Sequence, residues 1–171
     1  DDEKVVIMWE EAGSTEGICV VGTVSGTSIS FGSETVFDTD RPSGTSGKGI
    51  SLTYNTNANK VVLAYIDSGN SYRGTSRVGT ISGTSISFGT ATTFGSSYAQ
   101  DDPGICSMAT NKVVIVYNDN SNSYYGTAIV GTISGTGISF GTPSVYKSSQ
   151  SNFNRVALND SDNTKVTIIY R

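Results

Sequence analysis

The chain repeats one twelve-residue segment three times, and this repetition limits its possible folds more than any other feature. The copies are VGTVSGTSISFG at Val21–Gly32, VGTISGTSISFG at Val78–Gly89 and VGTISGTGISFG at Val130–Gly141. A second motif, a lysine before a short apolar run, recurs at intervals of 56, 52 and 53 residues, at Lys4, Lys60, Lys112 and Lys165. A fixed period of this length predicts a repeat architecture, in which each unit buries its apolar face against the next copy.

Within each period apolar and polar residues alternate, and no helical periodicity is present. In the second copy we expect strands at about residues 49–54, 60–66, 74–81 and 85–94, and the third copy divides in the same way. Four antiparallel strands in about fifty residues are the content of one β-propeller blade. The predicted fold class is therefore all-β, with about three tandem four-stranded antiparallel blades of β-propeller type, each 52 to 56 residues long.

The predicted strands, named A to D within a blade, do not divide the chain into whole blades. The first repeat (1–48) holds strands B, C and D, the second (49–103) and the third (104–152) hold all four, and 153–171 begins a fourth repeat with A and B. Propellers typically have four to eight blades, so one chain gives an incomplete ring with uncovered faces and strand edges. We expect copies of the chain, or further repeats of a longer parent chain, to cover them.

The repeated VGT(V/I)SGTSISFG segment follows a KVV(I/L)xY strand and a loop rich in Asp, Asn and Ser. This combination resembles tandem β-propeller-like repeat proteins of environmental microbial and phage surfaces and appendages, and the resemblance spans nearly the whole chain. It implies an extracellular, repetitive and non-enzymatic role, and it identifies no ligand. The first copy departs from the pattern, with Trp9-Glu10-Glu11 where the second has Tyr65-Ile66-Asp67.

Composition argues against several functions. The formal net charge is −4 and there is no Lys/Arg stripe, which argues against a nucleic-acid partner. The chain contains no histidine, the usual acid–base group near neutral pH and the commonest metal ligand. No apolar stretch is long enough to cross a bilayer. The chain begins Asp1-Asp2 rather than Met, which leads us to expect a processed or excised product.

The two cysteines, Cys19 and Cys106, occupy different places in the repeat. A disulfide framework would place an even set at recurring positions. We therefore predict that both are buried apolar residues, with a single bridge between them as the alternative.

The loops between strands B and C are the candidate ligand-binding sites. Asp and Asn supply donors and acceptors for sugar hydroxyls, a Tyr ring can stack on a pyranose, and repetition would add avidity. The alternative is that Asp and Asn satisfy turn backbone groups while Tyr packs against the next blade. The candidate residues are Asp67, Asn70, Tyr72, Asp119, Asn122 and Tyr124.

Paired acids are candidates for Ca²⁺ binding or for a glycosidase pair. No EF-hand or other calcium-loop pattern accompanies them, and neither does the sialidase box, so we expect no cofactor, with Ca²⁺ as the alternative. Two pairs precede a strand A and one lies in an A–B turn: Asp38 and Asp40, Asp101 and Asp102, and Asp160 and Asp162.

The Gly-Thr pairs of the repeated segment have a structural and a functional interpretation. Gly26, Gly83 and Gly135 fall in the C–D turn, where glycine supplies a positive φ at little steric cost. A phosphate-binding loop would need a following lysine and helix, and the sequence has neither.

Asn159-Asp160-Ser161 is an N-glycosylation sequon, so Asn159 is a candidate glycan acceptor. Abundant Ser and Thr make O-linked glycans an equal expectation.

We predict a non-catalytic extracellular protein that self-assembles into a fibril, appendage or surface layer. The alternative is a carbohydrate-binding, lectin-like propeller adhesin that uses the B–C loops. A hydrolase is a third class, disfavoured because the sequence shows no nucleophile elbow or metal cluster.

Overall fold

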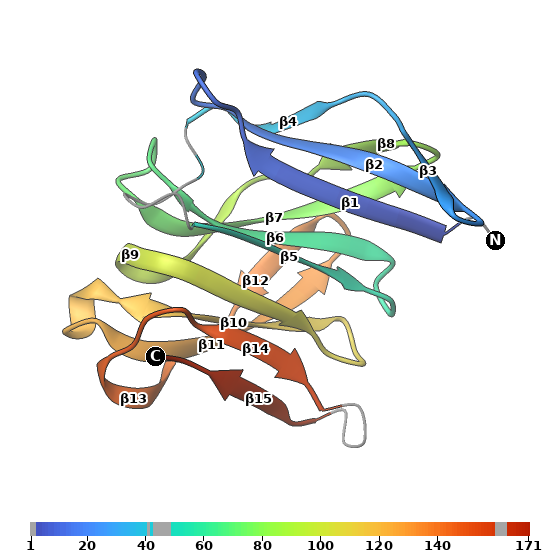
Figure 1. Ribbon diagram of the computed structural model, residues 1–171. Coiled ribbons are helices and arrows are strands. Elements are labelled where there is room, and N and C mark those ends of the chain that lie inside the picture. Colours follow the sequence, from blue (N-terminus) through green and yellow to red (C-terminus); the bar gives the residue numbers. More distant parts are fainter. Residues whose placement is uncertain (1–2, 41, 43–48, 160–163) are drawn as a thin grey trace.

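A computed structural model of the chain describes residues 3–40, 42, 49–159 and 164–171, and gives only the backbone for 96–102. The fold is all-β with antiparallel sheets, as the alternation predicts, and its one helical element among these residues is a 3₁₀ turn. The strands form layers that follow one another from the N-terminus to the C-terminus (Figure 1). No helix in the described ranges has the length and hydropathy needed to cross a membrane.

The first layer is a four-stranded sheet. β2 pairs with β1 along one edge, and with β3 and β4 in succession along the other. Its strands are β1 (Glu3–Glu10), β2 (Gly17–Ser25), β3 (Ser28–Phe31) and β4 (Thr35–Asp38).

The second layer continues the chain with strands in the order β5, β6, β7, followed by β8 and the start of β9 along the far edge of β7. Its strands are β5 (Ile50–Asn55), β6 (Lys60–Asp67), β7 (Arg73–Ser82), β8 (Ser85–Phe88) and β9 (Thr92–Ser107).

The third layer begins within β9, whose second half pairs with β10. β11 follows β10 and then pairs with β12 and β13 in succession. The elements are β10 (Lys112–Asp119), the 3₁₀ turn η1 (Asn120–Asn122), β11 (Tyr125–Ser134), β12 (Gly137–Phe140) and β13 (Ser144–Gln150). A final pair, β14 (Arg155–Leu158) and β15 (Val166–Ile169), forms a two-stranded sheet.

Two features differ from the strands predicted for the four repeats, which number thirteen in all. Each predicted strand D is split in two, because the chain leaves the sheet after a glycine whose N–H still bonds strand C, as Gly89 does to the Val78 carbonyl. The predicted connection between the second and third repeats is not a loop, because β9 runs through it and pairs with β7 and then β10. Fifteen strands therefore appear among the described residues.

Apolar residues on both faces of the central strands hold the layers together. Along β6, Val61, Leu63 and Tyr65 belong to the cluster shared with the first layer. The alternate residues of β6 belong to the cluster shared with the third layer, as expected for a strand buried on both faces. A third cluster joins the third layer to the β14–β15 pair. The repeat boundaries 1–48, 49–103, 104–152 and 153–171 stay a prediction.

Candidate functional site

The B–C loop of the second layer is a turn held by its own side chains. The Asp67 carboxylate accepts the Asn70 backbone N–H at 3.0 Å, and the Asn70 carbonyl accepts the Arg73 N–H at 3.2 Å. Ser71 and Tyr72 both have φ of 56°, and the half-buried Tyr72 packs against the cluster between the second and third layers. The Asp67 and Tyr72 side chains therefore have structural partners inside the protein.

The corresponding loop of the third layer has a similar conformation. Asp119 caps η1 by accepting the Ser121 N–H at 3.0 Å, and its backbone carbonyl accepts the Tyr124 N–H. Ser123 and Tyr124 have φ of 54° and 60°, the same pair of left-handed residues as in the second layer. Asn122 is exposed. A ligand-binding role for these six loop residues stays a prediction.

Three acids of the first and second layers meet near the second-layer B–C loop. Asp38 is buried and accepts the Tyr65 hydroxyl at 2.6 Å and the Asp40 N–H at 2.9 Å. Asp40 packs on Gly69, where an added Cβ would overlap its carboxylate. Burial, and next the charge of Asp38, raise the pKa of Asp67 above its ordinary value. Burial and the bond to Asp38 also raise the pKa of Tyr65, so that its hydroxyl donates rather than ionises.

The other predicted acids and the sequon give less structural information. Asp101 and Asp102 lie in β9 rather than in a loop, and their side chains are outside the described residues. Asp160 and Asp162 also lie outside them, whereas Asn159 is described and its backbone N–H bonds the Lys165 carbonyl. Within the described part of the chain, no group of three or more acidic, His or Cys side chains is placed to hold a metal ion.

Both cysteines are buried and unbridged, as predicted. Burial raises the pKa of the Cys19 thiol to about 11 and also raises that of Cys106. Both thiols are therefore protonated at neutral pH and are poor nucleophiles.

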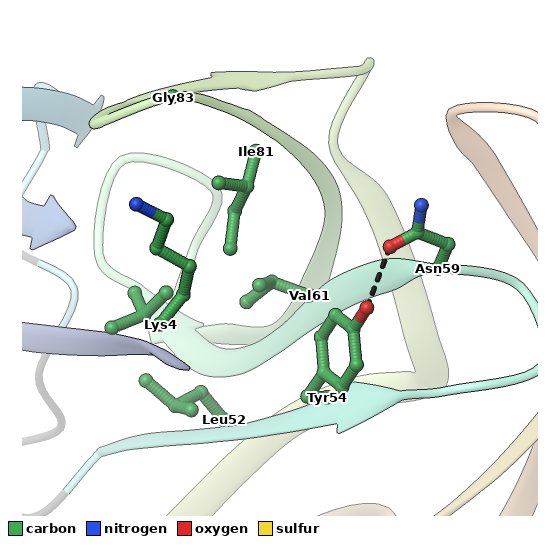
Figure 2. A pocket seen from close by; sticks show the side chains of 8 residues that line it. Lys4, Leu52, Tyr54, Asn59, Val61, Ile81 and Gly83 are labelled. Carbon is green, nitrogen blue, oxygen red and sulfur yellow. Dashed lines mark hydrogen bonds between the residues drawn. The ribbon is translucent and has the colours of Figure 1, made fainter. Parts of the chain in front are cut away.

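A cavity of about 460 Å³ lies between the first and second layers (Figure 2). Leu52, Val61 and Ile81 form its apolar wall, and the amine of Lys4 and the phenol of Tyr54 lie at its rim. The Tyr54 hydroxyl donates to the Asn59 side chain at 2.5 Å. The other residues that line it are Val6, Asn59 and Gly83.

The glycines after the repeated SISF or GISF segments mark contacts between layers that the sequence did not reveal. An added Cβ at Gly32 would overlap the Thr84 carbonyl oxygen, and one at Gly89 would overlap that of Thr136. In both cases the C–D turn of one layer rests on a glycine of the preceding layer. The turn glycines Gly26, Gly83 and Gly135 have φ of about 60°, as predicted from the sequence.

A buried amide also links two layers. The Asn55 Nδ2 donates to the carbonyls of Thr110 and Lys112 at 2.8 and 3.0 Å, across from the second layer to the third. Its carbonyl oxygen accepts the Ala58 N–H at 2.7 Å. No sequence signal distinguishes this residue, since Asn before a turn is ordinary.

Comparison with protein families, with curated proteins and with solved structures finds no match to the chain. The chain's own surfaces are therefore the guide to its function.

The apolar outer face of the first layer is the most unusual of these surfaces. Ile7 and Ile29 are each 45% exposed there, and Phe31 is 51% exposed. The corresponding residues of the later copies are covered: Ile86 and Ile138 are at most 7% exposed, and Leu63 and Ile115 are fully buried. The counterparts of Phe31, which are Phe88 and Phe140, are half-buried. These repeat positions are therefore buried or half-buried wherever a preceding layer exists.

Proposed function

We propose that the protein is a non-catalytic structural repeat protein whose propeller-type blades assemble, outside the cell, into a fibril, appendage or surface layer. The observation that carries the proposal is the exposed outer face of the first layer, whose counterparts in the second and third layers are buried or half-buried by the layer before them. Contiguous apolar surface of this kind usually marks a contact with another protein.

The edges of the sheets support the same function. Among the described residues, β1 pairs only with β2, and β14 and β15 pair only with each other. Exposed strand edges promote pairing with another chain unless something covers them. A contact between different ends of identical copies is heterologous, and if it does not close it produces a filament.

Electron microscopy of the purified chain tests this function directly. We expect long filaments, tubes or sheets in which this chain is the repeating unit, without added ligand or metal. Closed particles of a few copies, or monomers at every concentration, would contradict it.

A carbohydrate-binding role is the second candidate, and one observation favours it. The B–C loops of the second and third layers share a pair of left-handed residues, so the two loops have the same local backbone conformation at equivalent repeat positions. The lectin proposal requires that Tyr72→Ala and Tyr124→Ala abolish binding to a glycan array without altering assembly. In a structural protein Tyr72→Ala lowers the unfolding temperature, because Tyr72 packs against the core, and the wild-type chain binds no glycan.

A further inference from the structure

The third layer has an uncovered region that matches the exposed face of the first layer. Val130 is 43% exposed, whereas its counterparts Val21 and Val78 are fully buried by the layer that follows them. The reason is that β14 and β15 supply only the first two strand positions of a following layer. We call Val130 and Gly141 the tail surface, and Val5, Ile7, Ile29 and Phe31 the head surface.

The contact between such surfaces already occurs twice within the chain. Ile86 and Phe88 of the second layer pack with Val21 of the first. In the same way, Ile138 and Phe140 of the third layer pack with Val78 of the second. By this correspondence, Ile29 and Phe31 of the head surface fit Val130 of the tail surface.

The glycine contacts follow the same rule. The Thr84 turn rests on Gly32 and the Thr136 turn rests on Gly89, but among the described residues no turn rests on Gly141. The nearest atom to an added Cβ at Gly141 is the Val130 carbonyl oxygen at 3.8 Å. The matching turn at the other end of the chain contains Thr27, which is exposed.

Among the residues that the structure describes, no strand pairs with the outer edge of β1, where β6 and β10 have a partner in the next layers. There, β5 pairs with β6, and the second half of β9 pairs with β10. β5 and β9 also pack against each other across the two layers. The cavity between the first two layers lies next to β1 and is lined by Val6 of β1 and by Leu52 and Tyr54 of β5. Figure 2 shows Leu52 and Tyr54 on β5, the strand that a neighbour of β1 would cover.

β15 corresponds in sequence to β1. Lys165, Val166 and Ile168 match Lys4, Val5 and Ile7, and Tyr170 takes the place of Trp9. In this chain Val166 and Ile168 pack on the third layer, and the Tyr170 ring lies 5.6 Å from that of Tyr146. β15 pairs with β14 over four positions, whereas β1 pairs with β2 over eight.

We propose that β14 of one copy pairs with the open edge of β1 of a second copy. In this joint, β1 of the second copy takes the place that β15 of the first copy has beside β14. The joint forms a complete layer from β14 and the four strands of the second copy's first sheet. This layer places the head surface of the second copy on the tail surface of the first, and β14 fills the cavity beside β1. The proposal rests on the proposed function, because it specifies the contact through which copies polymerise.

Charge favours this head-to-tail pairing over pairing of like ends. Residues 1–37 carry seven acidic side chains and one lysine, whereas Asp38 and Asp40 lie against the second layer. Residues 144–171 carry four basic side chains and two acidic ones. Opposite charge on the two ends steers them together and disfavours contact between two heads.

The repeat also fixes the register of the joint. β14 places Ala157 opposite Thr167 of β15, and Thr167 corresponds to Val6 of β1. Ala157 of one copy therefore lies opposite Val6 of the next. Opposed residues of antiparallel strands have Cα atoms about 4.5–5.5 Å apart, within the range that a disulfide spans.

Cysteine cross-linking tests the register. The chain carrying both Val6→Cys and Ala157→Cys is assembled, oxidised and run on a non-reducing gel, where we expect a ladder of covalent oligomers. The single variants and the pair Val6→Cys with Leu158→Cys are matched controls, since a one-residue slip turns the side chain to the other face. Absence of the ladder from assembled protein, or an equal ladder from the control pair, would overturn the proposal.

Surface variants separate this joint from the proposed function. We expect Phe31→Glu and Gly141→Ala each to abolish assembly in light scattering while leaving the unfolding temperature unchanged. Val145→Glu is the control, because Val145 is equally exposed but belongs to neither surface. Filaments that survive both variants would overturn the joint and leave the structural function standing. A closed dimer that both variants dissociate would support the joint and contradict the fibril.

Discussion

The hydroxyl groups of Tyr65 and Tyr117 occupy corresponding repeat positions but have different surroundings. The Tyr65 hydroxyl donates to the buried Asp38 at 2.6 Å, whereas that of Tyr117 is buried without a partner among the described residues. We expect Tyr65→Phe to lower the free energy of unfolding by about 1–3 kcal/mol, because it leaves a buried carboxylate short of a donor. Tyr117→Phe should be neutral or slightly stabilising. Urea unfolding of both variants measures the difference, and equal losses would contradict this account.

The charge on Asp67 opposes folding at neutral pH. Its pKa is raised in the folded state by burial and by Asp38, so the unfolded chain loses this proton at a lower pH than the folded one. The contribution of this group to stability is therefore complete below the ordinary carboxyl pKa and falls as pH rises through the folded pKa. We expect Asp67→Asn to stabilise the protein by a few tenths of a kcal/mol at pH 7 and to make no difference near pH 3. Urea unfolding at the two pH values measures this, and a substitution that destabilises the protein more at pH 7 than at pH 3 would refute the sign.

At the residue scale, some features could be predicted from the sequence and others could not. The left-handed turn glycines and the two buried cysteines follow from local chemistry and spacing. The pairing of Asp38 with Tyr65 and the bonds of Asn55 to the third layer do not, because they join residues 27 and up to 57 positions apart. Such contacts depend on how layers are stacked, which no local pattern encodes.

At the scale of elements, Gly89 and Gly141 end corresponding strands but have different neighbours. An added Cβ at Gly89 would overlap the Thr136 carbonyl, whereas the nearest described atom to one at Gly141 is 3.8 Å away. We expect Gly89→Ala to cost about 1–3 kcal/mol of stability, as overpacking between rigid backbones does, and Gly141→Ala to cost almost nothing. Thermal unfolding of dilute, unassembled protein gives both values. A large loss for Gly141→Ala would mean that its surface is already covered within the chain.

The strands themselves were largely predictable, because period-two alternation and Gly-containing turns act locally. The Lys60–Ile66 prediction corresponds to β6 (Lys60–Asp67), and its two buried faces follow from its unbroken apolar run. The two ends of β9 were predicted as strands, but its middle was not, since Gly95, Asp101, Asp102 and Pro103 are residues that favour loops. Pairing with β7 and then with β10 overrides that preference. A register shift between Val116 and Asn118 of β10 accommodates the extra residues of β9 at this point.

At the scale of the whole molecule, the two ends of the chain are unlike, and this asymmetry determines how copies can associate. Among the described residues, the first layer lacks a strand beside β1, and the layer after the third is left at two strands. The sequence predicts these uncovered ends from the count of strands, but not which side chains they expose, because both faces of the central strands carry apolar residues. The structure assigns one face of each central strand to the preceding layer.

Two variants that each disable one end should complement each other. Phe31→Glu damages the head and leaves the tail intact, while Gly141→Ala damages the tail and leaves the head intact. Alone, each should stay monomeric; mixed in equal amounts, they should form one discrete heterodimer, because only one productive joint is possible between them. Analytical ultracentrifugation of each variant and of the mixture measures this. Polymers in the mixture would show that another surface joins the copies, and a mixture that stays monomeric would show that the head and tail surfaces do not meet.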